Sequence, residues 1–386
     1  MPYKIPVGPF HPALEEPYKL SVSCQGETIQ GVTIEVGFSF RAIELLAQQR
    51  NYIQDLTLVE RVCGICSGVH TLTFCMAAEA LAGIRPPDRA RFIRVIVAEL
   101  ERLHSHLLWM GIAAEDIGFQ TMFMEIFALR ERVMDVLELL SGSRVHYAAN
   151  CIGGVIGDIR DADAVLAAVR ETRRTLERDV VPVFTENLTA RARTSGVGVL
   201  TREHALAYGV VGPTARASGV PIDVRRDLPY AAYEELGFQI VTATDGDVRA
   251  RLVVRAMEML ESIRLIEQAL QTLPTGPTRA EKGFPVIPPG EATARAEAPR
   301  GELFYYLKSN GSEKPERIKV RTPSICNWAT VMNFAVGLKL ADMPMILAGI
   351  DPCFSCSDRM VIINRSNQYQ VWSWEDLRQY GIKYYR

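Results

Sequence analysis

The sequence has no long uninterrupted hydrophobic run. Its longest apolar stretch, residues 331–350, is broken by Lys339 and Asp342, so we expect no membrane span there. It also lacks a charged-then-apolar signal segment at the N-terminus and an excess of charge of either sign, because 43 lysines and arginines nearly balance 45 aspartates and glutamates. The composition therefore argues against a nucleic-acid partner, and any membrane association is expected through partner subunits.

The chain of 386 residues, 48% of them hydrophobic, can fill a sizeable core. Apolar periodicity predicts helices at 41–49, 89–110, 121–140, 162–187, 247–273 and 327–340, strands within 18–40, 303–307 and 317–320, and a loop over 274–300. We expect an α+β fold, mainly α, with a central helical bundle and small antiparallel β-sheets near both ends. One domain is predicted over 1–386, divided into a β-rich segment (1–60), a helical core (61–273), a loop, strand and helix segment (274–359) and a C-terminal tail (360–386).

Two cysteine pairs stand almost a whole chain apart. The first clip is residues 63–66, Cys-Gly-Ile-Cys, and the second clip is residues 353–356, Cys-Phe-Ser-Cys. Four thiolates from two such clips form a soft sulfur cage that selects zinc, iron–sulfur or another thiophilic metal, provided that the chain ends fold together. The other four cysteines are predicted to be buried packing residues: Cys24, Cys75, Cys151 and Cys326.

The surroundings of the clips, Arg-Val-Cys-Gly-Ile-Cys-Ser-Gly-Val-His and Asp-Pro-Cys-Phe-Ser-Cys-Ser-Asp-Arg, resemble the two signatures of the large subunit of nickel–iron hydrogenases. The resemblance implies a nickel–iron centre whose iron carries CO and cyanide ligands. It implies that Cys63 and Cys353 are terminal nickel ligands and that Cys66 and Cys356 bridge the two metals. His70 is similar to a family histidine that hydrogen-bonds a bridging sulfur, and such donors tune the thiolate.

Two further segments resemble that family. An Ala-Pro-Arg-Gly string implies that Arg300 hangs over the open coordination position, where a guanidinium can polarise a small ligand. Asp351 is similar to the acidic partner of this arginine. An Arg-Thr-Pro-Ser string implies that Arg321, Pro323 and Ser324 belong to the segment that contacts the diatomic ligands on iron, whose negative charge suits hydrogen-bond donors.

The resemblance also extends to acidic residues near the N-terminus. Residues 8–19 resemble a family string whose glutamate passes protons from a bridging cysteine, and both Glu15 and Glu16 fit that place, since the alignment can shift by one residue. Glu44 is similar to a glutamate that binds a magnesium or iron ion. That ion also needs a C-terminal histidine, and this chain has Arg359 there, so magnesium is implied less strongly than nickel and iron.

Other motifs indicate which branch of the hydrogenase family the sequence resembles. The Gly-Pro-Phe-His-Pro opening, Glu-Leu-Glu-Arg-Leu-His-Ser-His-Leu-Leu at 99–108 and Arg-Ala-Ser-Gly-Val at 216–220 also resemble the quinone-site subunit of complex I. With intact nickel cysteines, this combination is typical of membrane-bound, energy-converting hydrogenases such as those of formate hydrogenlyase. It implies reduction of protons to hydrogen, or the reverse, on the cytoplasmic side of the membrane. It implies these partners: an iron–sulfur small subunit, hydrophilic complex I-like subunits, ion-translocating membrane subunits, and ferredoxin or a formate dehydrogenase as electron donor.

Two other classes of protein stay open. One is a subunit stapled by zinc, although the two clips are much farther apart than the roughly 15–20 residues of a zinc ribbon. The other is a related reductase of sulfane sulfur or quinone. The tail is open as well: in many relatives a protease cuts after the residue equivalent to Arg359, so residues 360–386 are either a maturation segment or a permanent subunit contact. Their many aromatic residues favour retention.

Overall fold

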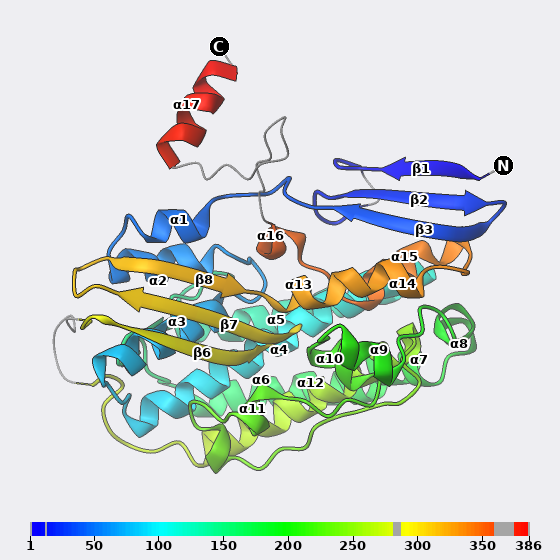
Figure 1. The fold of residues 1–386 in the computed structure, drawn as a ribbon. Coiled ribbons are helices and arrows are strands. Elements are labelled where there is room, and N and C mark those ends of the chain that lie inside the picture. The colour runs from blue at the N-terminus through cyan, green and yellow to red at the C-terminus, as the bar shows by residue number, and fades with distance from the viewer. Residues whose placement is uncertain (1, 12–13, 281–286, 359–373, 385–386) are drawn as a thin grey trace.

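Long helices form the centre of the protein. In the computed structural model the described residues are 2–11, 14–280, 287–358 and 374–384. The helix α4 (Asp88–Ile117) lies between α5 (Gln120–Ser141) and α12 (Val248–Gln271), and α6 (Ala162–Thr175) packs on α5 and α12 (Figure 1). Most residues of α4 are buried, because α5, α12, α15 and α3 pack against it. Among the described residues no helix is long and apolar enough to cross a membrane.

Small antiparallel sheets flank the helices. One has the order β1-β2-β3 and another β6-β7-β8, while β4 and β5 form a two-stranded ribbon. Gly26, with a φ of +58°, makes the turn between β2 and β3. The strand bounds are β1 Tyr3–Val7, β2 Lys19–Gln25, β3 Thr28–Glu35, β4 Asn150–Cys151, β5 Gly154–Val155, β6 Gly290–Ala298, β7 Gly301–Ser309 and β8 Pro315–Arg321. The prediction of a mainly α fold with small sheets near both ends is confirmed.

The remaining helices are mostly short and lie between or after the elements named above. Of these, α2 and α3 flank the first clip, and α16 carries most of the second clip. They are α1 Ile43–Ala47, α2 Tyr52–Glu60, α3 Ser67–Ala82, η1 Leu176–Val180, α7 Val181–Thr185, α8 Leu188–Thr194, α9 Arg202–Ala207, α10 Gly212–Arg216, α11 Val224–Asp227, η2 Tyr233–Glu235, α13 Pro323–Asn327, η3 Trp328–Thr330, α14 Val331–Phe334, η4 Leu340–Asp342, α15 Met343–Gly349, α16 Phe354–Ser357 and α17 Trp374–Tyr384.

Three predicted elements were wrong. The predicted loop over 274–300 contains β6, whose alanines at 294, 296 and 298 face the core while the strand pairs along its whole length with β7. Small alanines hide the alternation that a larger apolar residue would have made visible. The predicted helix 162–187 is interrupted by the wide turn η1, next to Pro182, whose ring nitrogen cannot donate a hydrogen bond. The predicted helix 327–340 is a series of single turns.

Asp55 on α2 is a buried acid for which the charge of Arg50 offsets only part of the cost of burial. Its side chain is inaccessible, and neither carboxyl oxygen has a hydrogen-bond partner in the described part of the chain. Burial raises its pKa to about 8, against a value near 3.8 when unfolded. The folded protein therefore holds a proton that the unfolded chain releases, and stability falls as the pH rises between those two values.

Asparagine resembles the protonated acid, so Asp55→Asn should increase the free energy of unfolding by about 2 kcal/mol at pH 8 and change it little near pH 4. Denaturant titrations of both proteins at the two pH values measure this. An equal effect at both values would show that Asp55 does not bind its proton as the burial indicates.

Candidate metal centre

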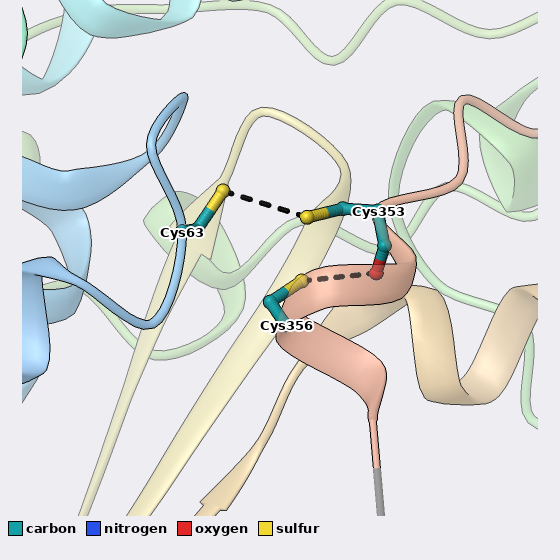
Figure 2. Close-up of side chains that lie close together, drawn as sticks. All are labelled: Cys63, Cys353 and Cys356. Carbon is teal, nitrogen blue, oxygen red and sulfur yellow. Dashed lines mark hydrogen bonds between the residues drawn. The ribbon is translucent and has the colours of Figure 1, made fainter. Parts of the chain in front are cut away.

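The two clips meet in the interior. The first clip forms the turn between α2 and α3, and the second leads into α16, so the sulfurs come from opposite ends of the chain (Figure 2). The Sγ atoms of Cys63 and Cys353 are 3.6 Å apart. Those of Cys63, Cys353 and Cys356 all lie within 4.8 Å of one another, and all three residues are buried. This is a separation that one metal ion can span, since metal–sulfur bonds are about 2.3 Å long.

Cys66 completes a buried cluster without joining that triad of sulfurs. It is 3% exposed and packs with the other three clip cysteines and Val62. Hydrogen bonds from neighbouring thiols, first of all from Cys353, hold the pKa of Cys63 well below its usual range. The pKa values of Cys66 and Cys353 are raised, first by hydrogen bonds with neighbouring thiols and then by burial and the charge on Cys63. The hydrogen bond of Cys356 with Cys353 lowers its pKa, but the hydrogen bond with Cys63, burial and the charge on Cys63 outweigh this and raise it. One charged thiolate makes it harder for its neighbours to lose their protons. A bound cation would offset this repulsion, so the cluster suits a metal ion.

His70 lies on α3, one helical turn beyond the first clip, and is fully buried. Its Nδ1 is hydrogen-bonded to the Tyr305 hydroxyl at 2.7 Å. Its Nε2 is buried without a partner among the described residues. Burial lowers the His70 pKa to about 4, so the ring is neutral. The implied bond to a sulfur is not formed in this structure, but a donor is left over that could make it.

Arg300 and Asp351 form the predicted pair. The Arg300 Nη2 is 2.7 Å from the Asp351 Oδ1, and its Nε donates to the Asp351 backbone carbonyl at 2.9 Å. Asp351 has a φ of +52°, an uncommon conformation just before the second clip. Gly301 follows the arginine with a φ of +128°, and a Cβ there would lie within 3 Å of the Gly212 backbone. The strained backbone and the ion pair fix the guanidinium beside the clips.

Glu16, rather than Glu15, contacts the second clip. Its carboxylate accepts hydrogen bonds from the backbone N–H groups of Phe354 and Ser355, the latter at 3.1 Å, and from the Cys353 thiol at 3.8 Å. These contacts place an acid directly against a sulfur of the cage.

Glu15 faces a cleft of about 550 Å³ between the N-terminal sheet, α4 and α15. The residue as a whole is exposed, but protein atoms surround its carboxyl enough to remove much of the water from it. This partial burial, followed by the charges of Asp351 and Asp116, raises its pKa to about 7. Burial likewise raises the pKa of Asp116, on the same cleft, to about 6. The cleft thus holds two acids that change protonation near neutral pH.

Two family models match different parts of the chain. Residues 116–286 and 280–359 match the family of the respiratory-chain NADH dehydrogenase 49 kDa subunit, and residues 41–111 match the nickel-dependent hydrogenase family. The carbon monoxide-induced hydrogenase of Rhodospirillum rubrum is 43% identical over 359 residues, which cover 92% of this chain and 99% of the relative. The protein belongs to the family of membrane-bound hydrogenase large subunits and complex I 49 kDa subunits.

Family members differ in what they do. The membrane-bound hydrogenase subunit alpha of Pyrococcus furiosus is 40% identical over 98% of this chain and 92% of its own. A subunit of the NADH-quinone oxidoreductase of Geotalea uraniireducens is 37% identical over 92% and 98%. A chain in the solved structure of the membrane-bound sulfane sulfur reductase, an archaeal respiratory membrane complex, superposes with a TM-score of 0.87 at 34% identity, covering 92% of this chain and 98% of that one. Family membership therefore supports an oxidoreductase subunit of a membrane complex.

The segment that the hydrogenase resemblance linked to the iron ligands divides into two parts. Ser324 accepts a hydrogen bond from the Cys353 backbone at 3.0 Å, next to the buried Pro323 that opens α13. Arg321 instead is exposed, pairs with Glu302 and lies over the Phe304 ring at 5.3 Å. The structure brings Pro323 and Ser324 to the clips and leaves Arg321 on the surface.

Glu44 has partners that occupy its carboxylate. Lys319 Nζ lies 2.6 Å from one oxygen, and the Val320 N–H donates to the other at 2.9 Å. A lysine ammonium thus stands where a cation would be needed, which weakens the expectation of magnesium. Arg359 and the cleavage position after it lie outside the described residues, so the fate of the tail stays a prediction. Of the four other cysteines, Cys24 and Cys75 are buried, as predicted, while Cys151 and Cys326 are half-buried.

Sequence reasoning missed two residues on α4 that hold the first clip. The Glu101 carboxylate accepts hydrogen bonds from the N–H groups of Gly68 (2.6 Å) and Val69 (2.9 Å) at the start of α3. His104 is hydrogen-bonded through Nε2 to the Ile65 carbonyl at 2.8 Å. Their spacing of three residues, which puts both on one helix face, was visible in the sequence, but their target was not.

Proposed function

We propose that this chain is the catalytic subunit of a nickel–iron hydrogenase that reduces protons to hydrogen or performs the reverse reaction. The observation that carries the proposal is the convergence of three buried sulfurs from opposite ends of the chain, with Cys66 in the same cluster. Soft thiolates suit nickel and iron. In this assignment Cys63 and Cys353 would hold the nickel, and Cys66 and Cys356 would hold both metals.

When bound, the nickel–iron centre with its CO and cyanide ligands would supply the redox chemistry of hydrogen cleavage and formation. The protein's part is to orient and to move protons. Arg300, held by Asp351, presents a fixed positive charge beside the clips. Pro323 and Ser324 line the second clip as contacts for the iron ligands, and His70 Nε2 is a spare donor for a sulfur. Arg321, paired on the surface, is left out of this assignment.

Protons leave or reach the cage through Glu16, which is the acid hydrogen-bonded to the Cys353 thiol. Glu15 on the neighbouring cleft can exchange a proton with solvent near neutral pH, because its pKa is about 7. Glu16 is therefore the acid next to the sulfur, and Glu15 is the next acid outward.

Electrons have to come from another subunit. In the described chain the clips supply the only group of cysteine, histidine and acidic side chains close enough together to hold a metal. We propose an iron–sulfur small subunit as the immediate partner, within an assembly of hydrophilic complex I-like subunits and ion-translocating membrane subunits on the cytoplasmic side of the membrane. Ferredoxin or a formate dehydrogenase is the proposed donor.

A second candidate is a reductase of sulfane sulfur or quinone, which is favoured by the structural similarity to the sulfane sulfur reductase complex. The two functions are separated by assaying the purified complex with reduced methyl viologen, using protons, polysulfide or a quinone as the acceptor. Hydrogen evolution that exceeds reduction of the other two acceptors supports the hydrogenase. Reduction of polysulfide or quinone without hydrogen evolution would assign the chain to the second candidate.

A further inference from the structure

Arg41 bridges the backbones of the two clip regions. Its Nη2 donates a hydrogen bond to the Val62 carbonyl, just before the first clip, at 3.0 Å. The same nitrogen donates to the Ser355 carbonyl, inside the second clip, at 2.6 Å, and Nη1 donates to the Arg61 carbonyl. A single guanidinium therefore contacts segments that lie near opposite ends of the sequence.

The segment that carries Arg41 is itself fastened to the second clip. We call residues 37–41, between β3 and α1, the strap. Asp358, directly after α16, accepts hydrogen bonds from the strap backbone at Gly37 (2.8 Å) and Ser39 (2.5 Å). The Arg41 Nε donates to the Ser39 carbonyl at 3.2 Å, which fixes the side chain to its own strap. Asp358 thus anchors the strap at one end, and Arg41 joins the clips at the other.

Arginine has the geometry for this task. Its planar guanidinium offers five N–H donors in a rigid fork, and hydrogen bonds from a charged donor are stronger than neutral ones. A lysine ammonium is a point donor on a flexible stem and cannot replace the fork. Arg41, Asp358 and Cys356 also line one cavity of about 220 Å³, so the strap lies directly beside a cage sulfur.

We propose that Arg41 is a positioning residue that sets the distance between the two clips and so preorganises the cysteine sulfurs for metal. The side chain acts through the carbonyls of residues 61, 62 and 355 and does not contact the metal itself. The inference rests on the proposed function only for the identity of the metal, because the distance between the clips matters for any metal that they share.

Disulfide trapping in the metal-free, full-length chain tests the proposal without hydrogenase activity. Diamide oxidises two nearby thiols to a disulfide, and peptide mapping identifies the Cys63–Cys353 bond, whose sulfurs are 3.6 Å apart. Arg41→Ala should slow formation of this bond about tenfold. A tenfold change corresponds to about 1.4 kcal/mol, which is roughly the net contribution of one hydrogen bond to a charged group. Arg41→Lys should be intermediate. The control Arg174→Ala, at an exposed arginine of α6 paired with Glu171, should match the wild type.

Nickel and iron bound per chain in the assembled complex should fall in the same order of variants, while the thermal unfolding midpoints stay close together. If Arg41→Ala does not fold, Arg41→Lys still supplies the trapping rate. A wild-type trapping rate in the Arg41 variants would overturn the positioning role. If trapping is slowed in the metal-free Arg41 variants while the wild-type complex binds no nickel, the proposed function is overturned and the positioning role of Arg41 stands.

Discussion

Replacing Glu16 with glutamine should lower hydrogen turnover by about 10²–10⁴-fold, the range expected when a general acid–base group is removed. Glutamine keeps the size of the side chain and one oxygen that can accept from the N–H groups of Phe354 and Ser355, so nickel and iron should stay bound. It cannot take a proton from the Cys353 thiol. Turnover with reduced methyl viologen and metal content are measured on the same purified complex.

The matched control is Glu15→Gln one residue away. Both glutamates line the cleft, but the described hydrogen bonds to the second clip are made by Glu16, so we expect this variant to lose less activity than Glu16→Gln. The larger loss in Glu15→Gln would reverse the order of the two acids in the path. Full activity in both variants would remove the pair from the mechanism.

Replacing Cys63 with serine should abolish both nickel binding and hydrogen turnover. The Cys63 sulfur belongs to the converging triad, and its pKa is the one that the neighbouring thiols lower. A serine hydroxyl is a hard, weakly acidic group that does not replace a soft thiolate ligand. Metal analysis should find less than a tenth of the wild-type nickel. A tenfold loss of affinity corresponds to roughly 1.4 kcal/mol, and we expect one thiolate ligand to contribute well over that amount.

Cys151→Ser is the control, since Cys151 is half-buried and lies outside the clip cluster. It should retain its nickel and its turnover. Normal nickel content in Cys63→Ser would mean that the metal, if there is one, is held elsewhere.

The clips show what sequence alone can predict about this site. A C-x-x-C turn is local, so each pair could be predicted as a candidate ligand pair, and a soft-metal cage was predicted on condition that the two chain ends meet. The ion pair of Arg300 with Asp351 also agreed with the prediction, because the resemblance supplied the motifs on which both residues lie. The positions of the long helices α4, α5 and α12 followed from their apolar periodicity, although α4 continues to Ile117 and not only to the predicted residue 110.

Other parts of the site depend on tertiary contacts that no local pattern encodes. Glu15 and Glu16 are adjacent in a loop and both line the cleft, and it is the Glu16 carboxylate that accepts the hydrogen bond from the Cys353 thiol. Arg321 was expected at the iron ligands, but Glu302 on the neighbouring strand draws it to the surface. Lys319, which is distant in the sequence, pairs with the carboxylate of Glu44. Each of these outcomes depends on which part of the fold lies opposite the side chain, and a local sequence pattern does not encode that.

We propose above that the converging cysteines hold nickel and iron. Elemental analysis of the purified, assembled complex, combined with its infrared spectrum, tests this most directly. We predict nickel and iron in equal amounts in this subunit, together with infrared bands of CO and cyanide bound to iron, and the loss of both in Cys63→Ser. Zinc in place of nickel, with no CO or cyanide bands from an intact complex, would contradict the account and identify the four cysteines as a structural staple.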